Sequence, residues 1–228
     1  MKIMIKTNTA NLPDNPTECV ILLHGLLRSK KQMRYIESTL IHHGFEVINV
    51  NYSSNKHSID SLTDLVWNEI KKPISHRKVN FVGYSMGGLL ARNIIDKYKP
   101  KSIGRVILIG TPNNGSELAT FLQDNFFYQK LIGPAGQEIG TKNNTTKRLK
   151  TCNYELGCIA SRLNGLWKII YPISYFLLPK INDGRVSLKS TKVDGMKSHV
   201  IISCPHFFLP YSKKVNKYIV SFLKTGFF

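Results

Sequence analysis

Acidic residues are scarce in this chain of 228 residues, which has 14 Asp and Glu against 32 Lys and Arg and a formal net charge of +18. A field of this sign attracts anions such as nucleic acid, anionic lipid or an acidic protein. The basic residues are spread along the whole chain, however, and no nucleic-acid-binding motif accompanies them. Abundant Lys, Asn and Ile are also typical of an AT-rich gene. We therefore expect no nucleic-acid partner, and we keep an anionic membrane surface as a candidate partner.

Long hydrophobic runs are also missing. No stretch reaches the roughly 18 apolar residues that a membrane span needs. The N-terminal MKIMIKTNTANLPDNP has too short an apolar core for a signal peptide. We expect a cytoplasmic protein, and association with a membrane surface stays open. The length and the hydrophobic share of 42% suit one buried core, so we predict a single domain over residues 1–228. The sequence does not indicate an oligomeric state.

Paired cysteines and metal-ligand spacings are missing as well. The chain has four cysteines but no CxxC pair, which favours reduced thiols over a single bridge between Cys152 and Cys158. His42 and His43 are adjacent, so they cannot share one helix face as metal ligands spaced i and i+4 do. The stretch 133–140 matches neither GxGxxG nor the Walker pattern. We predict no metal and no cofactor.

Apolar runs of strand length alternate with helical patterns along the chain. This alternation predicts an α/β fold, in which helices flank a mostly parallel central sheet. We expect strands at residues 19–25, 45–52, 78–85, 104–111, 155–161 and 198–204.

The expected helices lie between these strands. A capping box of Ser29 and Gln32 opens the first helix. The helices are expected at residues 29–43, 59–72 and 86–98 and along an apolar stripe over 215–223. Two segments, 113–154 and 162–180, interrupt the alternation, and we predict that they are insertions above the sheet.

The stretch NFVGYSMGG contains the pattern GxSxG, with Gly83, Ser85 and Gly87 at its fixed positions. The pattern is weak alone, but here it follows a predicted buried strand and opens a predicted helix, as a nucleophile elbow must. The residues two before and two after such a serine must lack bulk, and both glycines satisfy this. The Met86 amide would lie at a helix N-terminus, where a developing oxyanion is stabilised. The alternative is a close-packed turn without chemistry.

The stretch HGLLRS after the first predicted strand supplies a second candidate donor. Gly25 allows an unusual backbone there, which would direct the Leu26 amide at a substrate oxygen. His24 precedes Ser85 in the chain, the wrong order for the base of this elbow, so we interpret it as a structural anchor. Arg28 is a candidate for a phosphate contact, with a solvated residue beside a helix start as the favoured alternative.

An elbow of this kind implies the chain order Ser, then Asp or Glu, then His. His199 and His206 both lie downstream of Ser85, and we favour His206 because it follows the last strand at the carboxyl end of the sheet. Asp183 and Asp194 both precede it, each in an Asp-Gly pair that is typical of a turn. We favour Asp183 because Asp194 leads into the amino end of the last strand.

Seven blocks in order resemble one known family. They are HGLLRS, FVGYSMGGLLAR, VILIGTPNNGSELA, GPAGQEIG, YELGCIAS, NDGRVSLKST and SHVIISCPHFFLP. Together they resemble the compact lipase-like α/β-hydrolases, small relatives of the triacylglycerol lipases and of the GPI inositol-deacylase-like branch. The resemblance covers the chain from about Cys19 to Phe222. Tyr84 stands where many relatives have His.

The resemblance implies Ser85 as nucleophile, Asp183 as acid and His206 as base, with Leu26 and Met86 at the oxyanion positions. We predict a serine esterase or lipase that cleaves a small-molecule or lipid ester through an acyl-enzyme. An acyltransferase or a phospholipase on the same triad is the first alternative. A basic module that binds membrane or nucleic acid, with a vestigial site, is the second.

An acyl pocket is expected from apolar residues near Ser85 and in the aromatic segment GLWKIIYPISYFLLPK. Ordinary core packing is the alternative for the aromatic residues. The predicted pocket residues are Leu27, Trp167, Tyr171 and Phe176.

Overall fold

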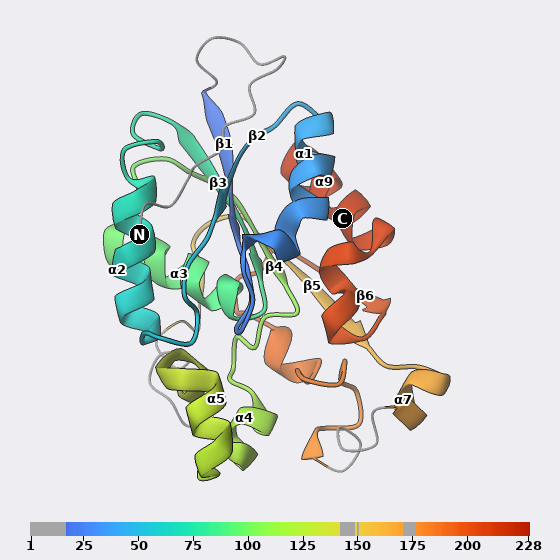
Figure 1. The fold of residues 1–228 in the computed structure, drawn as a ribbon. Coiled ribbons are helices and arrows are strands. Elements are labelled where there is room, and N and C mark those ends of the chain that lie inside the picture. Colours follow the sequence, from blue (N-terminus) through green and yellow to red (C-terminus); the bar gives the residue numbers. More distant parts are fainter. Residues whose placement is uncertain (1–16, 142–148, 150, 171–176) are drawn as a thin grey trace.

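A parallel sheet forms the centre of the protein in a computed structural model that describes residues 17–141, 149, 151–170 and 177–228. Across this part of the chain, six strands pair in the order β2-β1-β3-β4-β5-β6, and every pair is parallel (Figure 1). The strands are β1 (Glu18–Leu23), β2 (Glu46–Val50), β3 (Lys78–Tyr84), β4 (Ile103–Ile109), β5 (Leu156–Arg162) and β6 (Ser198–Ser203). This confirms the predicted sheet and the position of all six predicted strands.

The strand order determines where a site can form. From β1 the chain crosses to β2 on one side, and from β2 it passes back over β1 to β3 on the other side. Open parallel sheets bind ligands beyond the carboxyl ends of two strands where the order reverses in this way. Leu23 and Gly83 are register partners at that edge, so the loop that begins at His24 lies beside the turn at Ser85.

Helices cover both faces of the sheet (Figure 1). Ile21 packs in a core with residues of α2 and α3 on one face, and its neighbour Leu22 packs in a core with residues of α1 and α9 on the other. A strand that is buried on both faces is apolar at every position rather than at alternate ones, which explains the run CVILL in β1. These helices are α1 (Arg34–His42), α2 (Ile59–Ile70), α3 (Met86–Tyr98) and α9 (Lys213–Thr225).

Capping side chains define the ends of several helices. The Ser58 hydroxyl accepts from the amide of Ser61 at the start of α2, and Gly226, with φ of 78°, ends α9. The predicted capping box at Ser29 is wrong, because Ser29 makes no side-chain hydrogen bond there and a 3-10 helix, η1 (Lys30–Met33), comes first. The Gln32 side chain points back to the loop after β1 instead.

The two segments that interrupt the alternation carry short helices beyond the carboxyl ends of the strands (Figure 1). Within the described part of 113–154, α5 has a kink at Gly133, where φ is 66°. That these segments form a cap stays a prediction. Their helices are α4 (Glu117–Leu122), α5 (Phe126–Gln137) and α7 (Leu166–Ile170), and two 3-10 helices follow, η2 (Lys189–Thr191) and η3 (His206–Tyr211).

All four cysteines are free, so Cys152 and Cys158 form no bridge in this structure. Burial raises the pKa of the Cys158 thiol to about 12 and that of the Cys204 thiol to about 11. Both thiols are therefore protonated at neutral pH, and Cys204 is a poor nucleophile although it lies close to His206. Among the described residues, no helix is long and apolar enough to cross a bilayer.

Gly83→Ala tests the close packing of β3 against α3. The added methyl group would lie 2.5 Å from the Cα of Gly88 and 2.6 Å from the carbonyl oxygen of Gly87, which are backbone atoms. We expect urea denaturation to show a loss of about 2–3 kcal/mol in the free energy of unfolding, because only backbone movement relieves the overlap. Gly140→Ala is the control, since its closest neighbour is the Thr120 hydroxyl at 3.3 Å. Equal losses in the two variants would contradict this account.

Candidate active site

The turn between β3 and α3 holds Ser85 in a strained backbone conformation, with φ of 54° and ψ of −123°. The Ser85 amide donates to the carbonyl of Ile109 at 2.8 Å, which ties the turn to β4. A side chain at Gly87 would lie 2.2 Å from the carbonyl oxygen of Leu23, so only glycine lets α3 approach the end of β1. The surrounding structure thus holds a conformation that costs of order 1–3 kcal/mol in isolation.

The structure brings Ser85, His206 and Asp183 into one chain of hydrogen bonds. The His206 Nε2 lies 3.1 Å from the Ser85 Oγ, and its Nδ1 lies 2.8 Å from the Asp183 Oδ2. A carboxylate only accepts hydrogen bonds, so Nδ1 carries the proton and the Nε2 lone pair faces the serine hydroxyl. Asp183 and His206 are both buried, whereas Ser85 borders a cavity.

Four donors fix the orientation of the Asp183 carboxylate. Its Oδ1 accepts from the amides of Arg185 at 3.1 Å and Val186 at 2.8 Å. Its Oδ2 accepts from His206 and from the Ser161 hydroxyl at 3.0 Å. Ser161 was missing from the sequence prediction. It lies near the carboxyl end of β5, and that position at the same sheet edge was the only signal for it.

Tyr84 connects the turn to the loop that carries His206. Its hydroxyl donates to the His206 carbonyl at 3.0 Å, and the two rings lie 5.2 Å apart. Burial raises the pKa of Tyr84, so the phenol keeps the proton that it donates. A Cβ at Gly25 would lie 3.0 Å from the Tyr84 ring. Gly25 is therefore needed for the loop after β1 to pass this ring.

The loop after β1 is held by His24 and Gln32. The Gln32 Oε1 accepts from the Gly25 amide at 3.2 Å. The next amide, of Leu26, and the Met86 amide at the start of α3 have no acceptor in the hydrogen bonds of the described residues. Two free amides beside Ser85 fit the predicted oxyanion positions, which stay a prediction.

His24 is fully buried and lies outside the hydrogen-bond chain of Ser85, in agreement with its predicted role as an anchor. Its Nδ1 donates to the Gly25 carbonyl at 2.9 Å, and its Nε2 accepts from the Tyr52 amide at 3.4 Å. The Tyr52 ring stacks on it at 3.9 Å, and the Tyr52 hydroxyl donates to the His24 carbonyl. Burial lowers the pKa of His24 to about 4.

The rival acid and base lie elsewhere. The Asp194 carbonyl accepts from the Cys152 amide at 3.1 Å, in a bridge at the amino end of the sheet. The His199 Nε2 lies 3.2 Å from the Thr191 hydroxyl. The structure therefore places Asp183 and His206 beside Ser85 and leaves their rivals outside the site.

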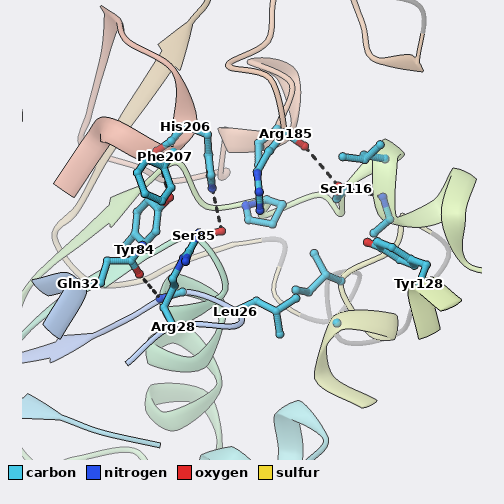
Figure 2. Close-up of a pocket in the computed structure, with 17 residues that line it drawn as sticks. Leu26, Arg28, Gln32, Tyr84, Ser85, Ser116, Tyr128, Arg185, His206 and Phe207 are labelled. Atoms are coloured by element: carbon cyan, nitrogen blue, oxygen red, sulfur yellow. Dashed lines mark hydrogen bonds between the residues drawn. The ribbon is translucent and has the colours of Figure 1, made fainter. Parts of the chain in front are cut away.

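A cavity of about 90 Å³ opens beside Ser85 (Figure 2). This is smaller than the roughly 300–1,000 Å³ of drug-sized ligand sites, so a larger ligand would extend past its rim. Residues of α5, of the β1 loop and of η3 contribute to the wall. The apolar side chains that line it include Leu26, Leu118, Ala119, Ile139 and Val186.

Leu27 and Trp167, two of the four predicted pocket residues, do not line this cavity. Leu27 has a positive φ of 57° and its amide bonds to the Ser54 hydroxyl, so its side chain is turned to solvent. Trp167 packs against Phe208, with ring centroids 5.7 Å apart. Tyr171 and Phe176 lie outside the described residues.

No group of three or more His, Cys, Asp or Glu side chains in the described ranges has the arrangement of a metal site. The donors around Ser85 are one histidine, one aspartate and backbone amides, and each side chain already has a protein partner.

The strand order and the turn at Ser85 define a fold of the α/β hydrolase class. The family model described as alpha/beta hydrolase fold matches residues 18–131, half of the chain. The chain therefore belongs to the α/β hydrolase fold family.

Two curated proteins that are similar to part of this chain are named triacylglycerol lipases. A triacylglycerol lipase of Pseudarthrobacter phenanthrenivorans is 33% identical over 116 residues, which are 46% of this chain and 36% of that protein. A triacylglycerol lipase of Burkholderia plantarii is also 33% identical, over 46% of this chain and 32% of that protein. The match thus spans about a third of the length of these curated relatives.

A solved structure extends the similarity of fold to the whole chain. The mature lipase BlEst2 of Bacillus licheniformis superposes with a TM-score of 0.75 at 16% identity, and the match covers 96% of each chain. At this identity the similarity shows the fold alone.

Stability in acid tests the anchor role of His24. Its pKa is about 4 when folded and about 6.5 when unfolded, so the unfolded chain binds more protons between these values. We expect the free energy of unfolding to fall as the pH drops from about 6.5 to 4, by up to about 3 kcal/mol. Urea denaturation at several pH values measures this slope.

His24→Gln should flatten the slope, whereas His42→Gln, a change on the exposed side of α1, should keep it. An NMR titration of the wild-type protein gives the folded pKa of His24 directly. A value near 6.5 would contradict the burial argument.

Proposed function

We propose that the protein is a serine hydrolase that cleaves carboxylic esters, with Ser85 as nucleophile, His206 as base and Asp183 as the acid that orients it. The observation that carries the proposal is the pair of distances at His206, 3.1 Å to the Ser85 Oγ and 2.8 Å to the Asp183 Oδ2. Together they direct a lone pair of the imidazole at the serine hydroxyl, as base-assisted attack requires.

The reaction proceeds in two acyl transfers. The Ser85 Oγ bonds to the ester carbonyl carbon while its proton passes to His206 Nε2, and the amides of Leu26 and Met86 bind the oxyanion. The intermediate expels the alcohol, which takes the proton from His206, and the acyl group stays on Ser85. Water then attacks the acyl-enzyme with its proton going to His206, and that proton returns to Ser85 as the acid leaves.

Acyl lipids are the proposed substrates. Two curated relatives that match part of the chain are triacylglycerol lipases. Buried apolar side chains that suit an acyl group, Ala119, Ile139 and Val186, contribute to the cavity wall. A chain longer than the cavity would extend over the rim, where exposed aromatic side chains lie on both sides. These are Phe126 and Phe127 on α5 and Phe207, Phe208 and Tyr211 on η3.

An anionic membrane surface is the proposed partner at this rim. Exposed aromatic residues on helices beside a site insert into the headgroup region of a bilayer, and the net charge of +18 adds attraction to anionic lipid. Phe126 and Phe127 are the most exposed of these residues, at 68% and 80%.

Turnover of p-nitrophenyl butyrate tests the proposed roles. Ser85→Ala should abolish it, because no other group supplies the nucleophile. Asp183→Asn should lower kcat by about 10³–10⁴-fold, because the amide favours the wrong tautomer of His206. Asp194→Asn is the matched control and should retain the wild-type rate. Turnover by Ser85→Ala at the wild-type rate would contradict the proposal.

Sedimentation with lipid vesicles tests the membrane partner. The wild type should bind vesicles that contain phosphatidylglycerol more tightly than pure phosphatidylcholine vesicles, and less tightly as salt rises. The Phe126→Ser, Phe127→Ser double variant should bind at least about tenfold more weakly. Phe227→Ser, a similarly exposed change at 58% on the C-terminal segment, should bind like the wild type. Equal binding by all three proteins would refute the aromatic rim as the contact.

A further inference from the structure

The wall of the cavity beside Ser85 carries positive charge but no negative charge. Seventeen residues line it, and among them the permanently charged side chains are Arg28 and Arg185, without an Asp or Glu (Figure 2). A pocket for a neutral ester has no need of two guanidinium groups, because each carries a full positive charge at any physiological pH.

The two arginines come from the two loops that build the site. Arg28 lies two residues after Leu26 in the loop after β1, and its Cζ lies 5.0 Å from the centroid of the Phe207 ring. Arg185 lies two residues after Asp183, and its amide donates to that carboxylate. Both guanidinium groups act on Tyr84, where they oppose the rise in its pKa that burial causes. Each charge is therefore close to the turn that holds Ser85.

Neither guanidinium is neutralised within the part of the chain that the structure describes. The ion pairs there do not include Arg28 or Arg185. The Asp183 carboxylate is buried, and its four hydrogen bonds come from two backbone amides, the Ser161 hydroxyl and the His206 ring, so none comes from a guanidinium group. Glu117, next to two lining residues, accepts from the Ser187 hydroxyl at 2.6 Å. Both arginines are exposed at the mouth of the cavity.

We propose that Arg28 and Arg185 bind a phosphoryl group on the alcohol part of the ester, so that the preferred substrate is an acylated glycerol phosphate rather than a neutral glyceride. This inference rests on the proposed function of Ser85. The buried apolar side chains of the wall, Ala119, Ile139 and Val186, accept the acyl group, so the alcohol part lies nearer to solvent, as do the two exposed arginines. A phosphoryl group offers several oxygens to two guanidinium groups, and each can donate two parallel hydrogen bonds.

Two esters that differ only in this group test the inference. 1-Octanoylglycerol and 1-octanoylglycerol 3-phosphate carry the same acyl chain, and octanoate release gives kcat/KM for each below the concentration at which micelles form. The wild type should prefer the phosphorylated ester by at least about tenfold, since a hydrogen bond to a charged group contributes enough for about that factor. Arg28→Gln and Arg185→Gln should each lower the ratio of the two kcat/KM values by about tenfold.

Lys31→Gln and Lys189→Gln are the matched controls. Both lysines are exposed and lie close in sequence to the arginines, but they do not line the cavity. Both variants should retain the wild-type ratio of kcat/KM values, because each removes one positive charge from the protein without changing the cavity wall. A fall in the ratio that is equal in all four variants would overturn the two-arginine site in favour of net charge alone.

Glycerol 3-phosphate gives a direct measure of the same site. It should inhibit the wild-type turnover of p-nitrophenyl butyrate competitively, and about tenfold more weakly in Arg185→Gln, whereas glycerol should not inhibit. The wild type could hydrolyse p-nitrophenyl butyrate and yet show equal kcat/KM values for the two octanoyl esters. That result would overturn the phosphoryl site and leave the proposed function intact. No hydrolysis of any of the three esters would overturn the proposed function and the phosphoryl site with it.

Discussion

The positive φ of 54° at Ser85 is the constraint on which the rest of the site depends. The turn persists because three strands and a helix hold it. Its amide bonds to β4, Gly87 lets α3 meet the end of β1, and Gly83 lets β3 meet α3. Each contact is between backbone atoms, so none can yield by a change of rotamer. The sheet thus fixes the hydroxyl of Ser85 at the reversal point of the strand order.

The other parts of the site are built onto this turn. Tyr84, one residue before Ser85, donates to the His206 carbonyl, so the same turn locates both the hydroxyl and the imidazole that lies 3.1 Å from it. On the other side of Tyr84, Gly25 lets the loop after β1 run close to the Tyr84 ring. Buried His24 and Gln32 hold this loop, in which the Leu26 amide is free. The proposed stabilisation of an oxyanion by this amide requires a geometry that is set before substrate arrives.

The sequence predicts the sheet well, and the structure places the predicted Ser85, Asp183 and His206 close together, whereas the predicted Leu27 and Trp167 do not line the cavity. Gly83 and Gly87 are informative because a Cβ at either position would lie only 2.2–2.6 Å from backbone atoms, so no residue with a side chain fits there. His206 and Asp183 follow from the rule that sites lie at carboxyl ends of strands. Ser161 and Gln32 could not be identified, because their roles depend on contacts between loops that no local pattern encodes. Leu27 was misjudged for a related reason, since its positive φ turns an apolar side chain to solvent.

Activation of Ser85 by its contact with His206 can be measured by mass spectrometry of a covalent adduct. After incubation with a fluorophosphonate, the peptide that contains Ser85 should carry one phosphonyl group. The adduct should be lost in His206→Gln, because the serine hydroxyl then has no base. It should persist in His199→Gln, which changes the histidine outside the site. An adduct on another residue, or equal labelling in His206→Gln, would contradict the account.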